Sequence, residues 1–197
     1  LVCSYNKLTT LDLSNNSNLE FLDCMINQLT HLDVFQNHSL IELNCLGNKI
    51  NELEITDKPY LETIGCEGNQ LTRLSVSNNN SLISLNCSNN QIERLEVSHN
   101  ANLQYLNCDQ NRLTLLDLSE IRKLRSLSCA DNQLTDLDCS NNTSLELLYC
   151  ASNQISSLDL LKNQILRVLS CEDNMLSGID ISACDALVSL HCDDNQF

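Results

Sequence analysis

The feature that most constrains the fold of this chain is a strict 21-residue period. Cysteine occurs at ten positions spaced 21 residues apart: Cys3, Cys24, Cys45, Cys66, Cys87, Cys108, Cys129, Cys150, Cys171 and Cys192. An asparagine follows each of these cysteines three residues later, from Asn6 to Asn195. A fixed period of roughly 20 to 50 residues is typical of stacked structural repeats. The period therefore predicts a solenoid in which every coil adds one residue to each column of side chains.

Each repeat consists of two similar halves. One half reads L-x-x-L-x-C-x-x-N-x-L, as in residues 103–113, and the other reads L-x-x-L-D-L-S-x-N, as in residues 8–16. The first pattern resembles the leucine-rich-repeat signature, with cysteine at the inner strand position. The repeat as a whole is similar to the short 21-residue bacterial class called IRREKO, and the resemblance covers essentially all 197 residues. These repeats are scaffolds, so the resemblance implies a fold and not one particular function.

The alternation in L-x-C and in L-D-L has a period of two, which indicates a strand with one buried face. We therefore expect a β-rich leucine-rich-repeat solenoid with two short parallel strands per coil, about ten coils and little or no helix. At roughly 4.8 Å per coil its length is about 45–50 Å. We expect one solenoid over residues 1–197, as part of a longer protein, because Leu1 and Phe197 both fall inside repeats.

Composition and charge limit the partners. The chain has no Trp, three Phe and four Tyr, so its core consists mainly of Leu, Ile, Val and Cys in uniform layers. The net charge of −15 argues against a nucleic acid or an anionic membrane surface as the main ligand, because both require a basic face. No segment reaches the roughly 20 apolar residues of a membrane span, so we expect no direct membrane insertion.

The asparagine and cysteine columns are expected to be structural. An asparagine amide at a buried turn accepts from one backbone N–H and donates to a carbonyl of the adjoining coil. Stacked cysteines, roughly 5 Å apart with parallel side chains, have poor geometry for a disulfide, and neither C-x-x-C nor a histidine at ligand spacing occurs. We expect buried, reduced thiols and no metal or other cofactor. Two cysteines outside the column stay open: Cys139 could face Cys129 or Cys150 across the core, and Cys184 could be partly exposed.

A third column is acidic. It contains Asp12, Asp33, Glu54, Glu96, Asp117, Asp138, Asp159 and Asp180, with Ser75 as the one interruption. A serine often follows two residues later, at Ser14, Ser77, Ser98, Ser119, Ser140 and Ser182. Calcium binding is one interpretation, although calcium sites use six to eight oxygens from a closed loop with a glycine-permitted turn. The interpretation that we favour is a solvated face that blocks aggregation between sheets.

The L-x-C strand carries the more varied outward residues and is therefore the predicted binding face. The candidates are Phe21, Asp23, Met25, Asn44, Leu46, Glu67, Tyr105, Asn107, Asp109, Leu147, Tyr149, Glu172 and His191. In leucine-rich repeats that resemble this one, the same strand lines the concave surface that contacts ligands. Tyr105, Leu147 and Tyr149 lie within a few coils and are expected to form one amphipathic patch. The alternative is that these are isolated exposed aromatics, which are ordinary on protein surfaces.

A basic segment, residues 119–123 with Arg125 after it, departs from the repeat pattern. It is either a contact point for an acidic partner or a surface turn that has drifted in sequence, and we favour the turn.

No enzyme is predicted. The four histidines, His31, His38, His99 and His191, lie in different repeat columns, and no G-x-S-x-G, phosphate-binding loop or H-E-x-x-H sequence is present. We expect a module that binds another protein or a glycan, with other domains or subunits capping its open ends. The family resemblance implies a bacterial surface or secreted protein. The alternatives are a passive spacer and the recognition arm of a multidomain secreted effector enzyme.

Overall fold

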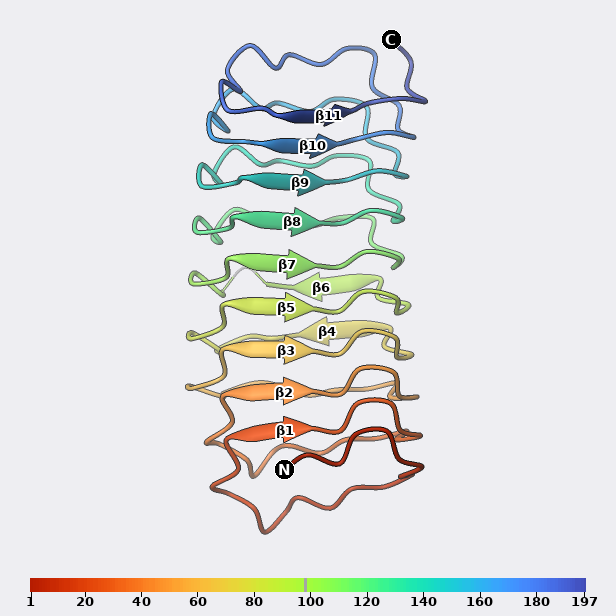
Figure 1. Cartoon of the computed structure of the whole chain (residues 1–197), viewed down its shortest axis with the longest axis vertical. Helices are drawn as coiled ribbons and strands as arrows, with labels where there is room; N and C mark the ends of the chain where they lie inside the picture. Colours follow the sequence, from red (N-terminus) through yellow and green to blue (C-terminus); the bar gives the residue numbers. More distant parts are fainter. Residues whose placement is uncertain (98) are drawn as a thin grey trace.

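The computed structural model describes residues 1–97 and 99–197, in which nine three-residue strands form one parallel sheet along the long axis (Figure 1). The strands follow one another in the order β1 (Phe21–Asp23), β2 (Glu42–Asn44), β3 (Thr63–Gly65), β5 (Ser84–Asn86), β7 (Tyr105–Asn107), β8 (Ser126–Ser128), β9 (Leu147–Tyr149), β10 (Val168–Ser170) and β11 (Ser189–His191). Each residue pairs with the residue 21 positions later, as Leu22 does with Leu43. We call this side of the molecule the front face.

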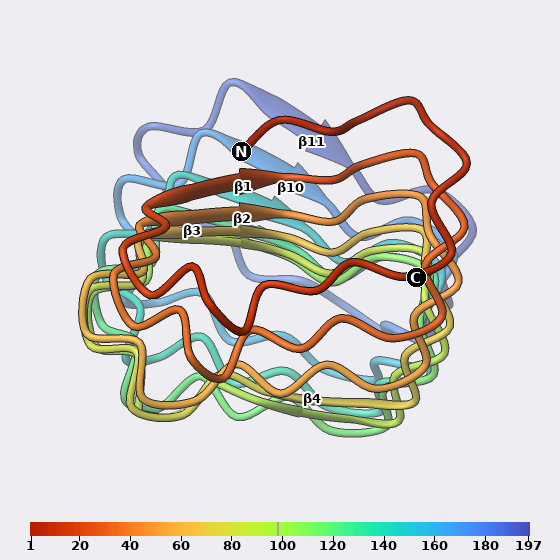
Figure 2. The same cartoon turned by 90° about the horizontal axis from the view of Figure 1, so that it is seen from below.

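The opposite side, which we call the rear face, carries the second half of each repeat. Here β4 (Arg73–Ser75) and β6 (Arg94–Glu96) form a two-stranded parallel sheet, and Asp159 and Asp180 form an isolated bridge. Figure 2 looks along the stack and shows β4 across the coil from β1, β2 and β3. The buried leucines of the two halves fill the space between the two faces.

The predicted fold class is confirmed: the chain is a parallel-strand solenoid with a 21-residue spacing, and the described residues contain no helix. Two details differ. The expectation of two strands in every coil is wrong, because described strands occur on the rear face in only two coils. The ten columnar cysteines also suggest ten front strands, whereas the described sheet has nine, because Val2 in the first repeat forms only an isolated bridge to Asp23. Ser98 of the predicted serine column lies outside the described residues.

The aspartates of the acidic column contribute to the scarcity of rear strands. In six coils an aspartate Oδ1 accepts the backbone N–H two residues later, at distances of 2.8–3.0 Å. Such local hydrogen bonds offer the backbone an alternative to a sheet ladder. The two rear strands occur at two of the three positions where the column lacks aspartate, Ser75 and Glu96, whereas the third, Glu54, lies outside a strand. These hydrogen bonds also lower the pKa of Asp12, with the N–H of Ser14 as the largest cause.

The first asparagine column holds neighbouring coils together, as predicted. In Asn111, Oδ1 accepts the N–H of Ile92 in the preceding coil at 2.9 Å. Its Nδ2 donates to the carbonyls of Cys87 and Cys108, both at 3.1 Å. The same three bonds recur at Asn27, Asn48, Asn69, Asn90, Asn132, Asn153, Asn174 and Asn195. Buried turn groups that would otherwise lack partners are thus paired across coils.

A left-handed backbone residue lies two positions after each columnar cysteine. Its φ lies between 52° and 65° in all ten repeats, at Tyr5, Ile26, Gly47, Gly68, Asn89, Gln110, Asp131, Ser152, Asp173 and Asp194. Only two of the ten are glycine, the residue that adopts this conformation at least strain, so the sequence did not signal it. The turn lets the N–H of Gln110 reach the carbonyl of Ala130 in the next coil at 2.9 Å. A ladder of main-chain hydrogen bonds therefore continues beyond the strand.

The cysteine column forms part of the core. The columnar cysteines from Cys24 to Cys171 are buried, Cys3 and Cys192 are half-buried in the end coils, and no cysteine is paired in a disulfide. Cys139 is buried as well. The expectation that Cys184 is partly exposed is wrong, because its side chain is buried and Sγ lies 4.0 Å from the carbonyl oxygen of Leu160. These thiols act as small apolar side chains.

Burial raises the pKa of the columnar thiols from Cys3 to Cys171. The pKa of Cys87 rises from 9.0 to about 12, mainly because burial disfavours the thiolate and secondarily because Asp109 and Glu67 are nearby. Cys24, Cys139 and Cys171 also have a pKa of about 12, again mainly because of burial. The folded state therefore holds thiol protons at a pH at which the unfolded chain releases them.

We predict that Asn111→Ala lowers the free energy of unfolding by about 3 kcal/mol, because one unsatisfied buried polar group costs roughly 1–3 kcal/mol and this change leaves several. Urea denaturation followed by circular dichroism gives the value. Asn141→Ala, at an exposed turn position, is the control and should change stability by less than about 0.5 kcal/mol. Equal effects of the two changes would contradict the structural role of the column.

We predict a loss of stability at high pH that originates in the buried thiols. A thiol with a raised folded pKa stabilises the fold fully below pH 9, and this stabilisation is lost as the pH rises toward 12. Within that window each such thiol contributes a slope of about −1.4 kcal/mol per pH unit. Cys87→Ala should make the slope of the unfolding free energy against pH shallower by about 1.4 kcal/mol per pH unit, the contribution of one thiol. Unchanged slopes in urea denaturation at pH 9 to 11 would refute this.

Candidate functional site

The front face presents two outward residues from each strand. In β7 the middle residue, Leu106, is buried, whereas Tyr105 is exposed and Asn107 is half-buried. The same alternation holds along most of the sheet, so the first and third strand residues form two outward columns. The position of a predicted binding residue on the front face therefore follows from the strand that carries it and from its place in that strand.

A hollow of about 310 Å³ lies on this face over strands β5, β7, β8 and β9. It is lined by Ser84, Leu85, Asn86, Tyr105, Leu106, Asn107, Ser126, Ser128 and Tyr149. In the register of the sheet, Ser126 lies beside Tyr105, and Ser128 lies beside Tyr149. The hollow exists because β8 offers two small side chains between the tyrosines of its neighbouring strands. We call it the tyrosine hollow.

The lining of the tyrosine hollow is neutral and amphipathic. The rings of Tyr105, which is 43% exposed, and Tyr149 supply apolar area, while serine hydroxyls and asparagine amides supply hydrogen bonds. Arg125, which precedes Ser126 in the chain, donates from Nε and Nη2 to Oε1 of Glu146, at 2.9 and 2.6 Å. An arrangement of this kind can desolvate an apolar group of a partner and meet its polar groups at the same time.

Asp109, one of the predicted site residues, supports this surface from within. Its two carboxylate oxygens accept from the Ser128 hydroxyl at 2.8 and 2.7 Å, and Oδ1 also accepts the N–H of Ala130 at 2.7 Å. Burial raises the pKa of Asp109, and the hydrogen bonds from Ser128 and Ala130 partly oppose the rise. The carboxylate therefore fixes the orientation of Ser128 in the hollow.

The remaining predicted residues lie elsewhere on the front face. Leu147 is on β9 beside Ser126 but does not line the hollow. Coils at the N-terminal end carry Phe21, Asp23, Met25, Asn44, Leu46 and Glu67, and the C-terminal coils carry Glu172 and, on β11, His191. The structure thus brings Tyr105, Asn107 and Tyr149 together, with Asp109 and Leu147 beside them, and spreads the other predicted residues along the sheet.

Two of the N-terminal residues have environments that the sequence did not reveal. Asn44 accepts the N–H of Leu46 through Oδ1, and its Nδ2 lies 3.6 Å from the sulfur of Met25. Glu67 folds toward Gly65, which has no side chain, and burial raises the pKa of the Glu67 carboxyl. Its Oε2 is buried without a hydrogen-bond partner among the described residues.

Sequence reasoning missed Ser84, Asn86, Ser126 and Ser128. These small residues make the space that the tyrosines border, yet each alone is an unremarkable surface residue. A comparison of adjacent repeats at the two outward positions would have found them, because Ser126 stands between Tyr105 and Leu147 in one column and Ser128 between Asn107 and Tyr149 in the other.

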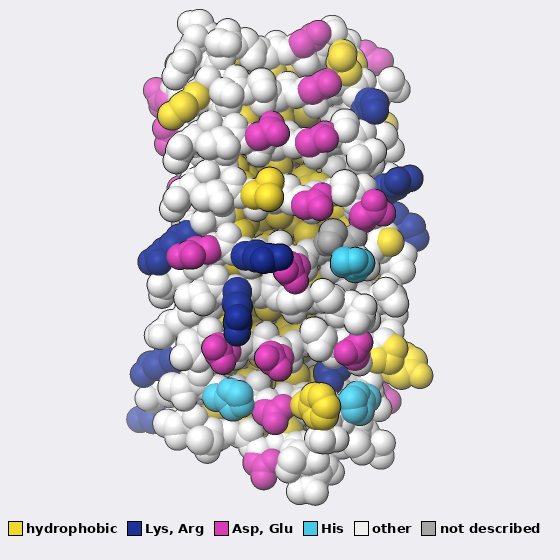
Figure 3. All heavy atoms as spheres, turned by 180° about the vertical axis from the view of Figure 1, so that it is seen from behind, with side chains coloured by type: hydrophobic (Ala, Val, Ile, Leu, Met, Phe, Trp, Pro, Cys, Tyr) yellow, Lys and Arg dark blue, Asp and Glu magenta, His cyan; other side chains and the backbone are white. Residues whose placement is uncertain are grey.

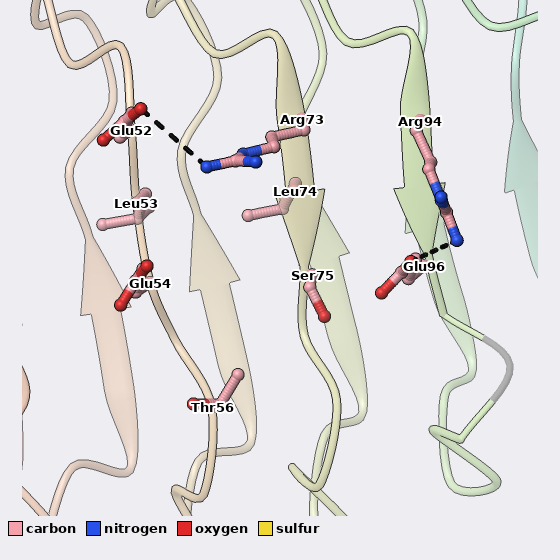
Figure 4. A pocket seen from close by; sticks show the side chains of 9 residues that line it. All are labelled: Glu52, Leu53, Glu54, Thr56, Arg73, Leu74, Ser75, Arg94 and Glu96. Carbon is pink, nitrogen blue, oxygen red and sulfur yellow. Dashed lines mark ion pairs between the residues drawn. The ribbon is translucent and has the colours of Figure 1, made fainter.

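A second hollow, of about 500 Å³, lies on the rear face and was also missed (Figure 4). It is lined by Glu52, Leu53, Glu54, Thr56, Arg73, Leu74, Ser75, Arg94 and Glu96. Figure 3 shows acidic side chains along this face, with basic side chains gathered near the middle. The available signal was the serine at position 75 in a column that is otherwise acidic.

Neither face offers an arrangement for metal chemistry among the residues that the structure describes. Within residues 1–97 and 99–197, no group of three or more His, Cys, Asp or Glu side chains is placed to hold a metal ion. Over the same ranges, no helix has the length and hydropathy to cross a bilayer.

Two family models match part of the chain. Residues 122–163 match the model described as leucine-rich repeats in two copies, and residues 102–124 match the single leucine-rich repeat. No curated protein sequence matches the chain.

Solved structures match over nearly the whole chain. The functional domain of InlJ from Listeria monocytogenes, whose description includes a cysteine ladder, is 39% identical with a TM-score of 0.94, covering 98% of this chain and 43% of that one. YopM from Yersinia enterocolitica is 27% identical with a TM-score of 0.82, covering 98% and 42%. The protein LIC12759 from Leptospira interrogans, at 23% identity and a TM-score of 0.76, covers 96% and 59% and shows the fold alone.

This chain therefore spans about 42% to 59% of the proteins to which these comparisons relate it. The 21-residue period, the parallel front sheet, the asparagine column and the matches to repeat models all lead to one architecture. The chain is a leucine-rich-repeat solenoid, and over nearly its whole length it is similar to the functional domain of InlJ.

Proposed function

We propose that this solenoid is a non-catalytic module that binds another protein or a glycan through its front face, centred on Tyr105, Leu147 and Tyr149. The observation that carries the proposal is the tyrosine hollow, in which two aromatic rings flank a floor of serines and asparagines. Interfaces are enriched in tyrosine, and their binding energy concentrates in a few such anchors.

The backbone below these side chains supports the proposal. β7, β8 and β9 are hydrogen-bonded on both sides within the sheet, so the tyrosines project from a fixed frame. A side chain with two rotatable bonds on a rigid frame loses little conformational entropy on binding. The Asp109 carboxylate, which holds Ser128, adds to this preorganisation.

The alternatives are weighed against the same surface. A passive spacer has no need for a neutral hollow on a chain whose net charge is −15. A recognition arm of a secreted effector enzyme would use the same front face, with its chemistry in another part of the protein. A bacterial surface or secreted location is part of our proposal, supported by the bacterial origin of InlJ and YopM, to which this chain is similar.

We predict that Tyr105→Ala and Tyr149→Ala each weaken partner binding by about 1–3 kcal/mol, because each removes an aromatic anchor from the hollow. A photo-crosslinking amino acid at position 126, beside Tyr105 in the hollow, first captures the partner from protein extracts and glycan preparations. Affinities of the purified partner are then compared by calorimetry.

The matched controls are Asp117→Asn and Asp138→Asn on the rear face. Each removes a charge but keeps an oxygen that accepts the N–H of Ser119 or Ser140, so the backbone turn survives. Affinity within a factor of two of wild type is expected. If these variants lose binding while the tyrosine variants keep it, the binding site lies on the rear face and the proposal is wrong. An absence of crosslinks would favour the passive spacer.

A further inference from the structure

The rear hollow is centred on the one break in the acidic column. Ser75 of β4 lies in register with Glu96 of β6, and Glu54 occupies the same column in the preceding coil. In Figure 4 the short Ser75 side chain leaves a gap, with Glu54 and Glu96 on either side of it. We call this gap the Ser75 notch. Its walls are thus carboxylates that lie about one coil spacing away in each direction.

The floor of the hollow is apolar. Leu53 and Leu74 are buried core residues whose outer surfaces line the hollow, and Thr56 adds a methyl group beside them. The hydroxyl of Ser75 lies 2.9 Å from that of Ser77, and whichever of them donates, the Ser75 oxygen keeps a lone pair that can accept a further hydrogen bond. A ligand here meets aliphatic surface below and oxygen atoms at the sides.

The two arginines leave the notch open. Arg73 and Arg94 are direct neighbours in the strand register, where like charges repel. Figure 4 shows that each turns away from the other. Arg73 reaches back to Glu52 at 3.9 Å, and Arg94 bonds Glu96 of its own strand at 2.8 Å. In the described part of the chain, Glu54 has no such partner.

The balance of charge selects a cation. Three carboxylates and two guanidinium groups line the hollow, which gives a net charge of −1 on a protein of net charge −15. An anion would have to approach within a few ångströms of Glu54 and Glu96, and both arginines already have carboxylate partners. A cation over Ser75 instead neutralises Glu54 and faces the half-exposed Glu96.

We propose that the rear hollow is a second docking site, separate from the front face, at which a partner protein inserts a lysine or arginine side chain into the Ser75 notch. The cationic head contacts the carboxylate of Glu54 and the hydroxyl of Ser75. Its methylene groups lie on Leu53 and Leu74, as basic side chains commonly cover apolar surface while the charged head stays solvated.

The experiment titrates the isotope-labelled full chain with the peptide acetyl-Gly-Lys-Gly-amide and follows backbone amide resonances by NMR. Because a single exposed ion pair is weak, we expect millimolar affinity, with shifts confined to residues 52–56, 73–77 and 94–96. The same peptide with an acetylated lysine should bind at least about fivefold more weakly. Equal binding of the acetylated peptide, or shifts elsewhere only, would overturn the proposal.

Glu54→Gln should weaken binding of the lysine peptide about fivefold or more, because it removes the unpaired carboxylate. Asp180→Asn is the matched control, since it makes the same charge change in the same column and keeps an acceptor for the Ser182 N–H. It should change affinity less than twofold. If both variants weaken binding equally, or if shifts follow the whole acidic column, the peptide senses only diffuse charge and the notch is not a site.

Discussion

The structure depends on one interaction, the buried asparagine amide that joins each coil to the coil before it. Asn111 accepts an N–H from the preceding coil and donates to a carbonyl of that coil and to one of its own. A single side chain therefore fixes both the local turn and the position of the neighbouring turn. Repeated every 21 residues, this leaves only one way to stack, and the leucine and cysteine columns close the core around it.

With the frame fixed from inside, the outward positions are free to differ between coils. The front face uses this freedom to place Tyr105 and Tyr149 around two serines. The rear face uses it less, because most of its aspartates are engaged by their own backbone. The acidic column is thus first a folding device and only secondarily a charged surface, which the solvation interpretation of the sequence did not include.

Features that repeat could be predicted from the sequence, and features that depend on exceptions could not. The period, the buried cysteines and the asparagine hydrogen bonds follow from residue types that recur in every coil. The rear strands form at two of the three positions where aspartate is absent, Ser75 and Glu96, and the tyrosine hollow forms where serines separate two aromatic residues. The left-handed turn escaped prediction for another reason: main-chain hydrogen bonds to the next coil impose it, even on a residue as unsuited to it as Ile26.

The same exceptions are where binding is most plausible in physical terms. A carboxylate that accepts its own backbone N–H, as that of Asp138 does, exchanges a local hydrogen bond for any new contact, so its net gain from a partner is small. Glu54 has one more methylene and makes no such bond in the described chain, so its charge is available to a ligand. Because Ser75 lies beside it, that free charge faces a gap instead of another carboxylate. Where the repeat has Glu54 and Ser75 instead of aspartate, the local hydrogen bond to the backbone is absent from the described chain, and space is left beside a free carboxylate.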